Sequence, residues 1–151
     1  MSKIAFLTAP FENYIDPNTR VMYPNKIQLV QTLIDYLERK GYKVYNSHRR
    51  EEWGKNWMKP EQSAPLNYQD TKNADVMVAI PGSPPSGGTH IEIGWASAFG
   101  VRVVLLLEKE KKYSNVILGL GDVAKVDYVW FNRLEEIVES EEALRSLDDL
   151  V

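Results

Sequence analysis

The chain has 151 residues, a hydrophobic fraction of 44% and a formal net charge of −3 at pH 7. This length suits one domain with a buried core, and the slightly acidic balance excludes a broad basic surface for nucleic acid. The lack of cysteine excludes disulfides, thiol catalysis and thiolate metal sites. No apolar run approaches the roughly 20 residues of a membrane span, and no long apolar targeting core is present, so we expect a cytoplasmic protein.

Strands and helices are predicted to alternate along the chain. Short apolar runs predict strands, and apolar residues at helical spacing predict helices. In chain order, the pattern predicts a strand at 3–8, a helix at 25–40, a strand at 42–45, a helix at 66–73, a strand at 76–80, a helix at 89–99, strands at 101–107 and 126–131, and a closing helical segment at 134–150. The stretch 48–65 is polar and rich in tryptophan without a clear period, and 109–115 reads as a charged loop.

The alternation indicates a single-domain α/β fold over residues 1–151. We expect a doubly wound, five-stranded parallel sheet of the flavodoxin or Rossmann-like kind, with helices on both faces. Ligands of such folds bind beyond the carboxyl ends of the strands. The loops after the first three strands, at 9–18, 47–65 and 81–88, are therefore expected to surround one crevice.

The third of these loops carries the strongest chemical signal. It is rich in glycine, serine and proline, and it leads from a buried strand into a helix near Glu92. Backbone N–H groups in such a loop and at a helix N-terminus form a cradle for an anion, and Ser83 and Ser86 add hydroxyl donors. A carboxylate beside an anion cradle suggests chemistry on a phosphorylated small molecule.

A structural explanation of Glu92 has to be weighed against this one. Thr89 and Glu92 match the capping box S/T-x-x-E, in which the glutamate returns to the backbone at the start of the helix. That role would account for Glu92 without any catalysis. Against it stand the size of the 81–88 loop, which is larger than a cap requires, and Asp70, which lies just upstream of the strand that feeds the loop.

The block from Asp70 to Gly100 resembles a known family. Its residues follow the pattern D-x-x-x-x-D-V-x-V-A and then S-x-G-x-x-x-E-I-G-x-A-x-A-x-G, which is similar to the nucleoside 2-deoxyribosyltransferase superfamily. The nearest branch hydrolyses nucleoside 5′-monophosphates and includes 2′-deoxynucleoside 5′-phosphate N-hydrolases and CMP hydrolases. The resemblance extends from Phe6 to about Phe131, although only 70–100 is specific.

The resemblance implies roles for individual residues. Glu92 would be the nucleophile at the anomeric carbon, and Asp70 would orient that carboxylate or the sugar, or help deliver a proton to the base. The transferases usually carry an acidic residue six positions before the nucleophile, where this chain has Ser86. A hydroxyl there, with the N–H groups of Gly87, Gly88 and Thr89, favours a 5′-phosphate over a free hydroxyl.

Further substrate-binding residues are predicted less directly, namely Phe6, Ala9, Arg20, His48 and Ser114. Arg20 would contact the phosphate or be an ordinary surface arginine, and Ser114 would reach the phosphate in a neighbouring subunit or be a plain loop hydroxyl. His48 would lie against the base or be solvated. Trp53 and Trp57 would cover the base or simply pack their loop. The resemblance also implies a homodimer or larger oligomer with a shared active site.

The function that we predict is hydrolysis of the N-glycosidic bond of a nucleoside 5′-monophosphate. The products would be the free base and a (deoxy)ribose 5-phosphate, formed through a glycosyl intermediate on Glu92 without a metal or other cofactor. The expected partner is a nucleotide or nucleoside, not a nucleic acid polymer or a membrane. Two alternatives remain: a nucleoside 2-deoxyribosyltransferase that exchanges bases, and a nucleotide-sensing module without turnover.

Overall fold

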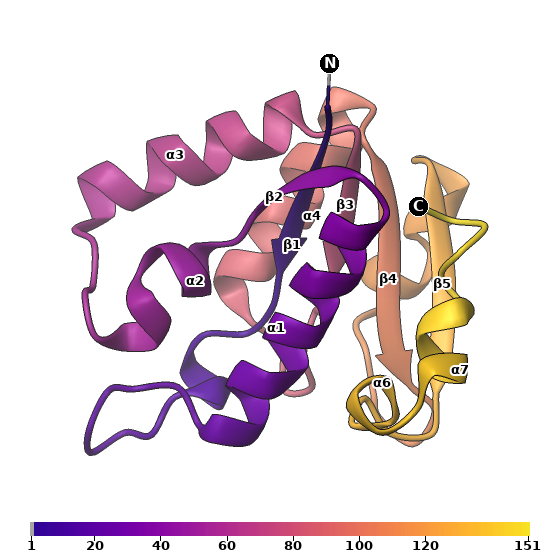
Figure 1. The fold of residues 1–151 in the computed structure, drawn as a ribbon. Coiled ribbons are helices and arrows are strands. Elements are labelled where there is room, and N and C mark those ends of the chain that lie inside the picture. Colours follow the sequence, from indigo (N-terminus) through magenta and orange to yellow (C-terminus); the bar gives the residue numbers. More distant parts are fainter. Residues whose placement is uncertain (1) are drawn as a thin grey trace.

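The computed structural model describes residues 2–151, and its centre is a five-stranded sheet in which every pairing is parallel (Figure 1). The strand order is β2-β1-β3-β4-β5. The bounds are Lys3–Thr8 for β1, Tyr42–Tyr45 for β2, Val76–Ala79 for β3, Arg102–Glu108 for β4 and Val126–Phe131 for β5. This confirms the predicted fold class.

Helices cover both faces of the sheet. They are α1 (Pro24–Arg39), α2 (Ser47–Arg50), α3 (Pro60–Asn73), α4 (Gly87–Phe99), α5 (Asn115–Leu118), α6 (Glu136–Glu139) and α7 (Glu141–Arg145), with 3-10 turns at Glu12–Tyr14, Glu52–Gly54 and Leu120–Asp122. In Figure 1, α1, α6 and α7 lie in front of the sheet and α4 lies behind it. Within residues 2–151, none of these helices has the length and apolar content needed to cross a membrane.

Alternation along the strands divides the core into two layers. In β1, Leu7 packs with the residues of α1, α6 and α7, whereas Phe6 points to the other face and packs with those of α4 and α5. Both side chains are fully buried. A parallel sheet covered on both sides needs apolar residues at successive positions, which explains why these strands read as continuous apolar runs.

The strand order fixes the place of the site. The chain passes from β1 to β2 on one side and later returns to place β3 on the other side of β1. The connections after β1 and β3 therefore diverge at the carboxyl ends of these two neighbouring strands. This is the switch point at which open α/β sheets bind their ligands.

Two segments differ from the sequence prediction. Part of the stretch 48–65 is helical: 47–50 forms the single turn α2, capped by Asn46, and α3 begins at Pro60 instead of residue 66. Proline suits the first turn of a helix, where its missing N–H leaves no bond unmade. The closing segment is two short helices, because Ser140 adopts an extended conformation and caps α7.

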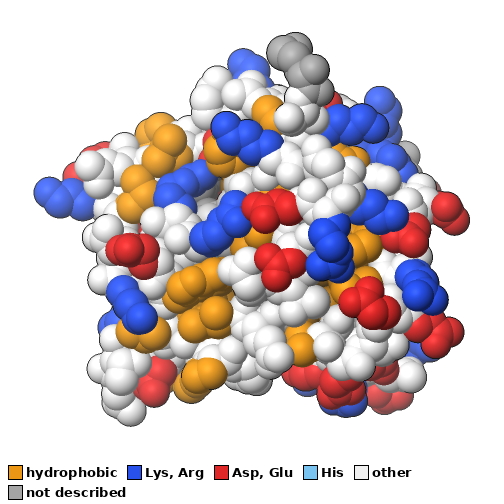
Figure 2. All heavy atoms as spheres, viewed as in Figure 1, with side chains coloured by type: hydrophobic (Ala, Val, Ile, Leu, Met, Phe, Trp, Pro, Cys, Tyr) orange, Lys and Arg blue, Asp and Glu red, His pale blue; other side chains and the backbone are white. Residues whose placement is uncertain are grey.

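The surface carries both signs of charge. On the face drawn in Figure 2, basic and acidic side chains are interspersed, with acidic side chains most frequent at the lower right, where α6 and α7 lie. Hydrophobic side chains reach the surface mainly in the left half of the same view. The described face therefore has no single-sign patch of the kind that recruits a polyanion.

Candidate active site

Glu92 lies in the second turn of α4, and the predicted capping box is wrong. The helix is capped by Ser86, whose Oγ accepts a hydrogen bond from the Thr89 N–H at 3.5 Å. Because this cap starts the helix at Gly87, Thr89 is already inside it and its side chain is not at the cap position. No acidic residue occupies the first turn, so helix capping does not explain Glu92.

The Glu92 carboxylate is held from the sheet. Only 7% of Glu92 is exposed, and Thr8, the last residue of β1, donates a hydrogen bond from Oγ1 to Glu92 Oε1 at 2.6 Å. The hydroxyls of Thr8 and Thr89 lie 3.2 Å apart. Burial raises the pKa of Glu92 to about 7, although the Thr8 hydrogen bond and the charge of Arg50 act in the opposite direction.

Asp70 is connected to Glu92 through Arg50. Asp70, on α3, forms a largely buried ion pair with Arg50, on α2. Arg50 also donates from Nη1 to Asn67 Oδ1 at 3.0 Å, and the same oxygen accepts from Ser47 at 2.9 Å. Since the positive charge of Arg50 lowers the pKa of Glu92, the two predicted catalytic carboxylates belong to one electrostatic network.

A cleft of about 380 Å³ opens beside Glu92. As predicted, all three loops at the carboxyl edge contribute to it: Phe11 after β1, Trp57 after β2 and Gly88 after β3. The other lining residues come from the segment after α2, from α3 and from α4; they are Glu51, Met58, Pro60, Ser63, Ala64, Asn67, Thr89, Ile91, Glu92 and Trp95. Apolar and aromatic walls beside the Glu92 carboxylate suit a flat ring joined to a polar group.

The aromatic wall is anchored on both sides. Phe11 stacks on His48 with ring centroids 4.0 Å apart and lies 5.5 Å from the Trp57 ring. Trp57 donates from Nε1 to the Arg20 carbonyl at 3.2 Å, and the Arg20 guanidinium lies 5.0 Å from the centre of its ring. Of the two tryptophans predicted to cover the base, Trp57 lines the cleft, whereas Trp53 packs against the core.

His48 is neither solvated nor on the surface of the cleft. It is 3% exposed, behind Phe11, and its Nε2 lies 3.0 Å from the Pro10 carbonyl. Its Nδ1 is buried without a hydrogen-bond partner. Burial lowers the pKa of His48 to about 4, so the ring is neutral at pH 7 and supports the aromatic wall.

Besides His48, the predicted residues that do not line the cleft are Asp70, Ser86, Gly87, Phe6, Ala9, Arg20 and Ser114. Phe6 and Ala9 are buried in the two core layers. Arg20 is exposed and pairs with Glu12 at 3.4 Å. Ser114 caps α5, where its Oγ accepts from the Ile117 N–H at 3.2 Å.

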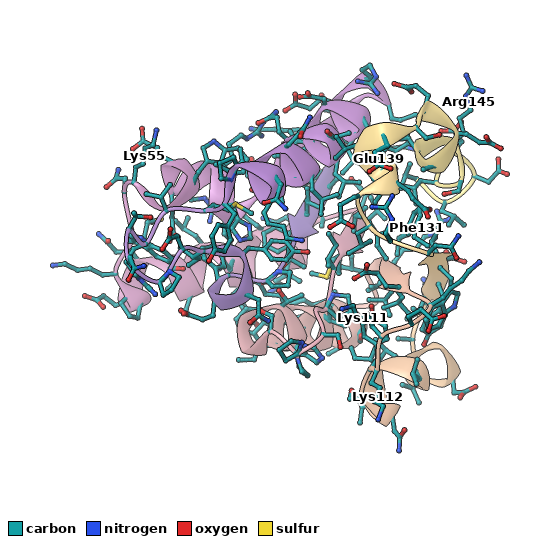
Figure 3. The ribbon with its side chains drawn as sticks, turned by 90° about the horizontal axis from the view of Figure 1, so that it is seen from below. Lys55, Lys111, Lys112, Phe131, Glu139 and Arg145 are labelled. Atoms are coloured by element: carbon teal, nitrogen blue, oxygen red, sulfur yellow. The ribbon has the colours of Figure 1, made fainter. Side chains whose placement is uncertain are left out.

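The loop before α4 is also tied to the neighbouring loop after β4. The Ser83 hydroxyl donates to the Lys112 carbonyl at 2.9 Å. Figure 3, which views the molecule from below, shows Lys111 and Lys112 close together in the lower right half and Lys55 well away from them at the upper left. Gly87 and Gly88 are exposed, and an added Cβ at either would meet no heavy atom within 4 Å.

Four residues of the site were not predicted from the sequence: Thr8, Phe11, Arg50 and Glu51. Thr8 could have been found by the reasoning applied to the loops, because it ends a strand at the carboxyl edge. Arg50 and Glu51 lie in and just after a single helical turn, which is too short to leave a period in the sequence. Among residues 2–151, no group of three or more histidine, cysteine, aspartate or glutamate side chains could hold a metal ion.

Several solved structures resemble this chain over its full length, and two of them are clearly related in sequence. The CMP N-glycosidase BcmB of Clostridium botulinum is 33% identical, with 99% of this chain and 100% of that chain covered and a TM-score of 0.72. BlsM is 40% identical, with 99% and 94% covered and a TM-score of 0.76. A conserved protein from Enterococcus faecalis V583, 16% identical over both full chains with a TM-score of 0.58, shares the fold. No family model and no curated protein sequence matches the chain.

Proposed function

Since this chain belongs to the nucleoside 2-deoxyribosyltransferase superfamily, among its N-glycosidase enzymes, we propose that it hydrolyses the N-glycosidic bond of a nucleoside 5′-monophosphate. The observation that carries the proposal is Glu92, a buried carboxylate that borders an open cleft and has no part in capping its helix. The likeness to BcmB, whose name specifies CMP, supports a cytosine nucleotide as the substrate.

In the proposed reaction, a Glu92 oxygen attacks the anomeric carbon. The bond from that carbon to the base nitrogen breaks, its electron pair leaves with the base, and an ester forms between the sugar and Glu92. Water then attacks the same carbon, the ester bond breaks, and the sugar 5-phosphate is released with Glu92 restored. The base takes up one proton and the water loses one, so the sequence is balanced.

Glu92 must be ionised to act as the nucleophile, and its surroundings set its pKa. Burial favours the protonated acid, whereas Thr8 and Arg50 favour the carboxylate. We assign Asp70 to the positioning of Arg50, because its carboxylate is paired there and Asp70 does not line the cleft. A pKa of about 7 leaves enough carboxylate at neutral pH for attack.

The start of α4 supports a phosphate-bearing substrate. The helix has 13 residues, and its first N–H groups, at Gly87 and Gly88, lie at the positive end of its dipole. Ser86 adds a hydroxyl where a carboxylate would repel the phosphate. The space around the two glycines allows a ligand to approach the backbone closely.

A chromatographic screen for free base tests this function. The substrates are ribo- and deoxyribonucleosides with and without a 5′-phosphate, and Glu92→Gln is the control protein. We expect base release from 5′-monophosphates by the wild type and a loss of at least about a hundredfold in the variant. Full activity of the variant, or equal cleavage of nucleosides, contradicts the proposal. A new nucleotide formed when a second base is added identifies a transferase, and binding without turnover identifies a sensor.

We also propose that a second copy of the chain completes the site, with Ser114 reaching the phosphate bound by its neighbour. In support, apolar side chains are exposed beside both residues: Ile91, next to Glu92, is 56% exposed, and Val116, close to Ser114, is 75% exposed. Contact with a second copy of the chain would remove both apolar side chains from water.

Complementation tests the shared site. Glu92→Gln and Ser114→Ala are each expected to be impaired as pure proteins. When the two are mixed and allowed to exchange subunits, one site of each mixed dimer has both native residues, so activity should reappear. Full activity of Ser114→Ala alone, or no recovery on mixing while subunits exchange, overturns this assignment.

A further inference from the structure

A second carboxylate borders the cleft, and nothing in the proposed reaction uses it. Glu51 follows α2 directly and is 3% exposed. It lines the same cleft as Glu92. Glu51 comes from the segment after α2 and Glu92 from α4, so one pocket presents two acidic groups in mostly apolar surroundings.

The hydrogen bonding of Glu51 is incomplete. Its Oε1 accepts a long hydrogen bond, 3.4 Å, from the Met58 N–H. Its Oε2 is buried and has no partner. Arg50, its neighbour in sequence, is engaged by Asp70 and Asn67. A buried acceptor without a donor is costly, so a ligand in the cleft that donates a hydrogen bond to it would be favoured.

We propose that Glu51 recognises the base, by accepting a hydrogen bond from an exocyclic amino group such as the N4 amino group of cytosine. This inference rests on the proposed function, since it deepens the description of the same site. The apolar walls formed by Phe11, Trp57 and Trp95 offer contact to the faces of a base but do not distinguish one base from another. An acceptor beside these walls discriminates between bases by its hydrogen bond.

The chemistry separates bases that are similar in shape. Cytosine presents an amino donor at position 4, whereas uracil presents a carbonyl acceptor at the same position. An acceptor of Glu51 placed against the uracil oxygen would leave two acceptors facing each other without a proton. Burial raises the pKa of Glu51. The neutral acid has an O–H that donates to a carbonyl, so the preference for an amino group belongs to the carboxylate and grows as the pH rises.

Binding of CMP and UMP tests the proposal without depending on turnover. The parent protein carries Glu92→Gln, so that neither nucleotide is consumed, and the fluorescence of Trp57 and Trp95 in the cleft reports occupancy. We expect this parent to bind CMP about ten- to a hundredfold more tightly than UMP. Addition of Glu51→Gln, whose amide can donate as well as accept, should bring the ratio close to one. Glu52→Gln, which changes the neighbouring exposed carboxylate, is the matched control and should leave the ratio unchanged.

The outcomes separate this inference from the proposed function. A role for Glu51 only in holding the Met58 segment would weaken both nucleotides equally, so an unchanged ratio in Glu51→Gln overturns the inference. Equal binding of CMP and UMP by the parent, including no binding of either, also overturns it. Selective binding of CMP by a protein that releases no base in the screen would support the inference and reject the proposed hydrolysis.

Discussion

Thr8 and Glu92 join the sheet to the helix that carries the candidate nucleophile, through a hydrogen bond of 2.6 Å between Oγ1 and Oε1. Thr8 is β-branched and lies at the end of a central strand, so its side chain has little freedom to turn. Glu92 is fixed in turn by its place on α4. A carboxylate held between two rigid elements keeps its direction when substrate enters, which is what a preorganised site requires.

The first prediction concerns the cost of keeping Glu92 buried. The pKa of Glu92 is about 7 in the folded protein against an ordinary 4.5. The folded state therefore holds the proton more tightly, and the contribution of this group to stability is complete below pH 4.5 and lost as the pH rises through 7. Glutamine does not ionise, so Glu92→Gln removes the destabilisation that appears as the pH rises. The variant should raise the free energy of unfolding at pH 8 by roughly 2–4 kcal/mol, but hardly at pH 5.

Urea unfolding of the two proteins at both pH values measures this effect. Glu110→Gln, on an exposed loop, serves as the control and should show no such difference. An equal stability change at pH 5 and pH 8 would mean that burial does not raise the pKa of Glu92.

The second prediction separates the two members of the buried ion pair. Loss of the positive charge in Arg50→Gln should raise the pKa of Glu92, so activity would need a higher pH. Asp70→Asn leaves the Arg50 charge less compensated and should move the acid limb of the pH–rate profile to lower pH. Profiles of kcat for both variants test the opposite signs. A shift in the same direction, or a changed rate without any shift from Asp70→Asn, would argue that Asp70 acts directly on substrate.

The third prediction tests the phosphate contact at the start of α4. Asparagine and aspartate both cap helices well and have the same shape, so neither Ser86→Asn nor Ser86→Asp should unfold the protein. Only aspartate adds a negative charge beside the expected phosphate. The kcat/KM for 5′-monophosphates should fall at least about tenfold further in Ser86→Asp than in Ser86→Asn. Equal kcat/KM values in the two variants would contradict binding of the phosphate at this position.

The fourth prediction concerns stability in acid. The pKa of His48 is about 4 in the fold against an ordinary 6.5, so the unfolded chain binds the proton more readily. Stability from this residue is present above pH 6.5 and lost as the pH falls towards 4, by roughly 2–4 kcal/mol. His48→Gln should unfold with a weaker dependence on pH between 6.5 and 4. The protein has two histidines, and the same change at His90 provides the comparison: an identical pH dependence in both variants would contradict the assignment.

Strong local patterns made most of the fold predictable. The strands at Lys3–Thr8, Tyr42–Tyr45 and Val126–Phe131 have the predicted bounds, because polar, glycine or proline residues interrupt these short apolar runs close to either end. The position of Glu92 beside the loop after β3 followed from the same reasoning. The start of α4 did not, since Ser86 and Thr89 are both good caps and the choice depends on how the loop before them folds.

The ion pair between Arg50 and Asp70 could not be predicted from the sequence, for another reason. Arg50 and Asp70 are 20 positions apart, on two elements whose relative position depends on the whole connection between β2 and β3. The burial of His48 likewise depends on Phe11, which lies in the loop after β1, before both α1 and β2. Contacts of this kind arise from tertiary packing, for which local periodicity carries no signal.

The open space around Gly87 and Gly88 determines how the protein responds to substitution at these two positions. Neither glycine has a positive φ, and neither has a neighbour that an extra methyl group would strike. Alanine at either position should therefore leave the free protein as stable as before, or slightly more so, because alanine favours a helix. If a phosphate binds against this backbone, the same methyl group would block its approach. The substitution would then weaken ligand binding without lowering the stability of the free protein.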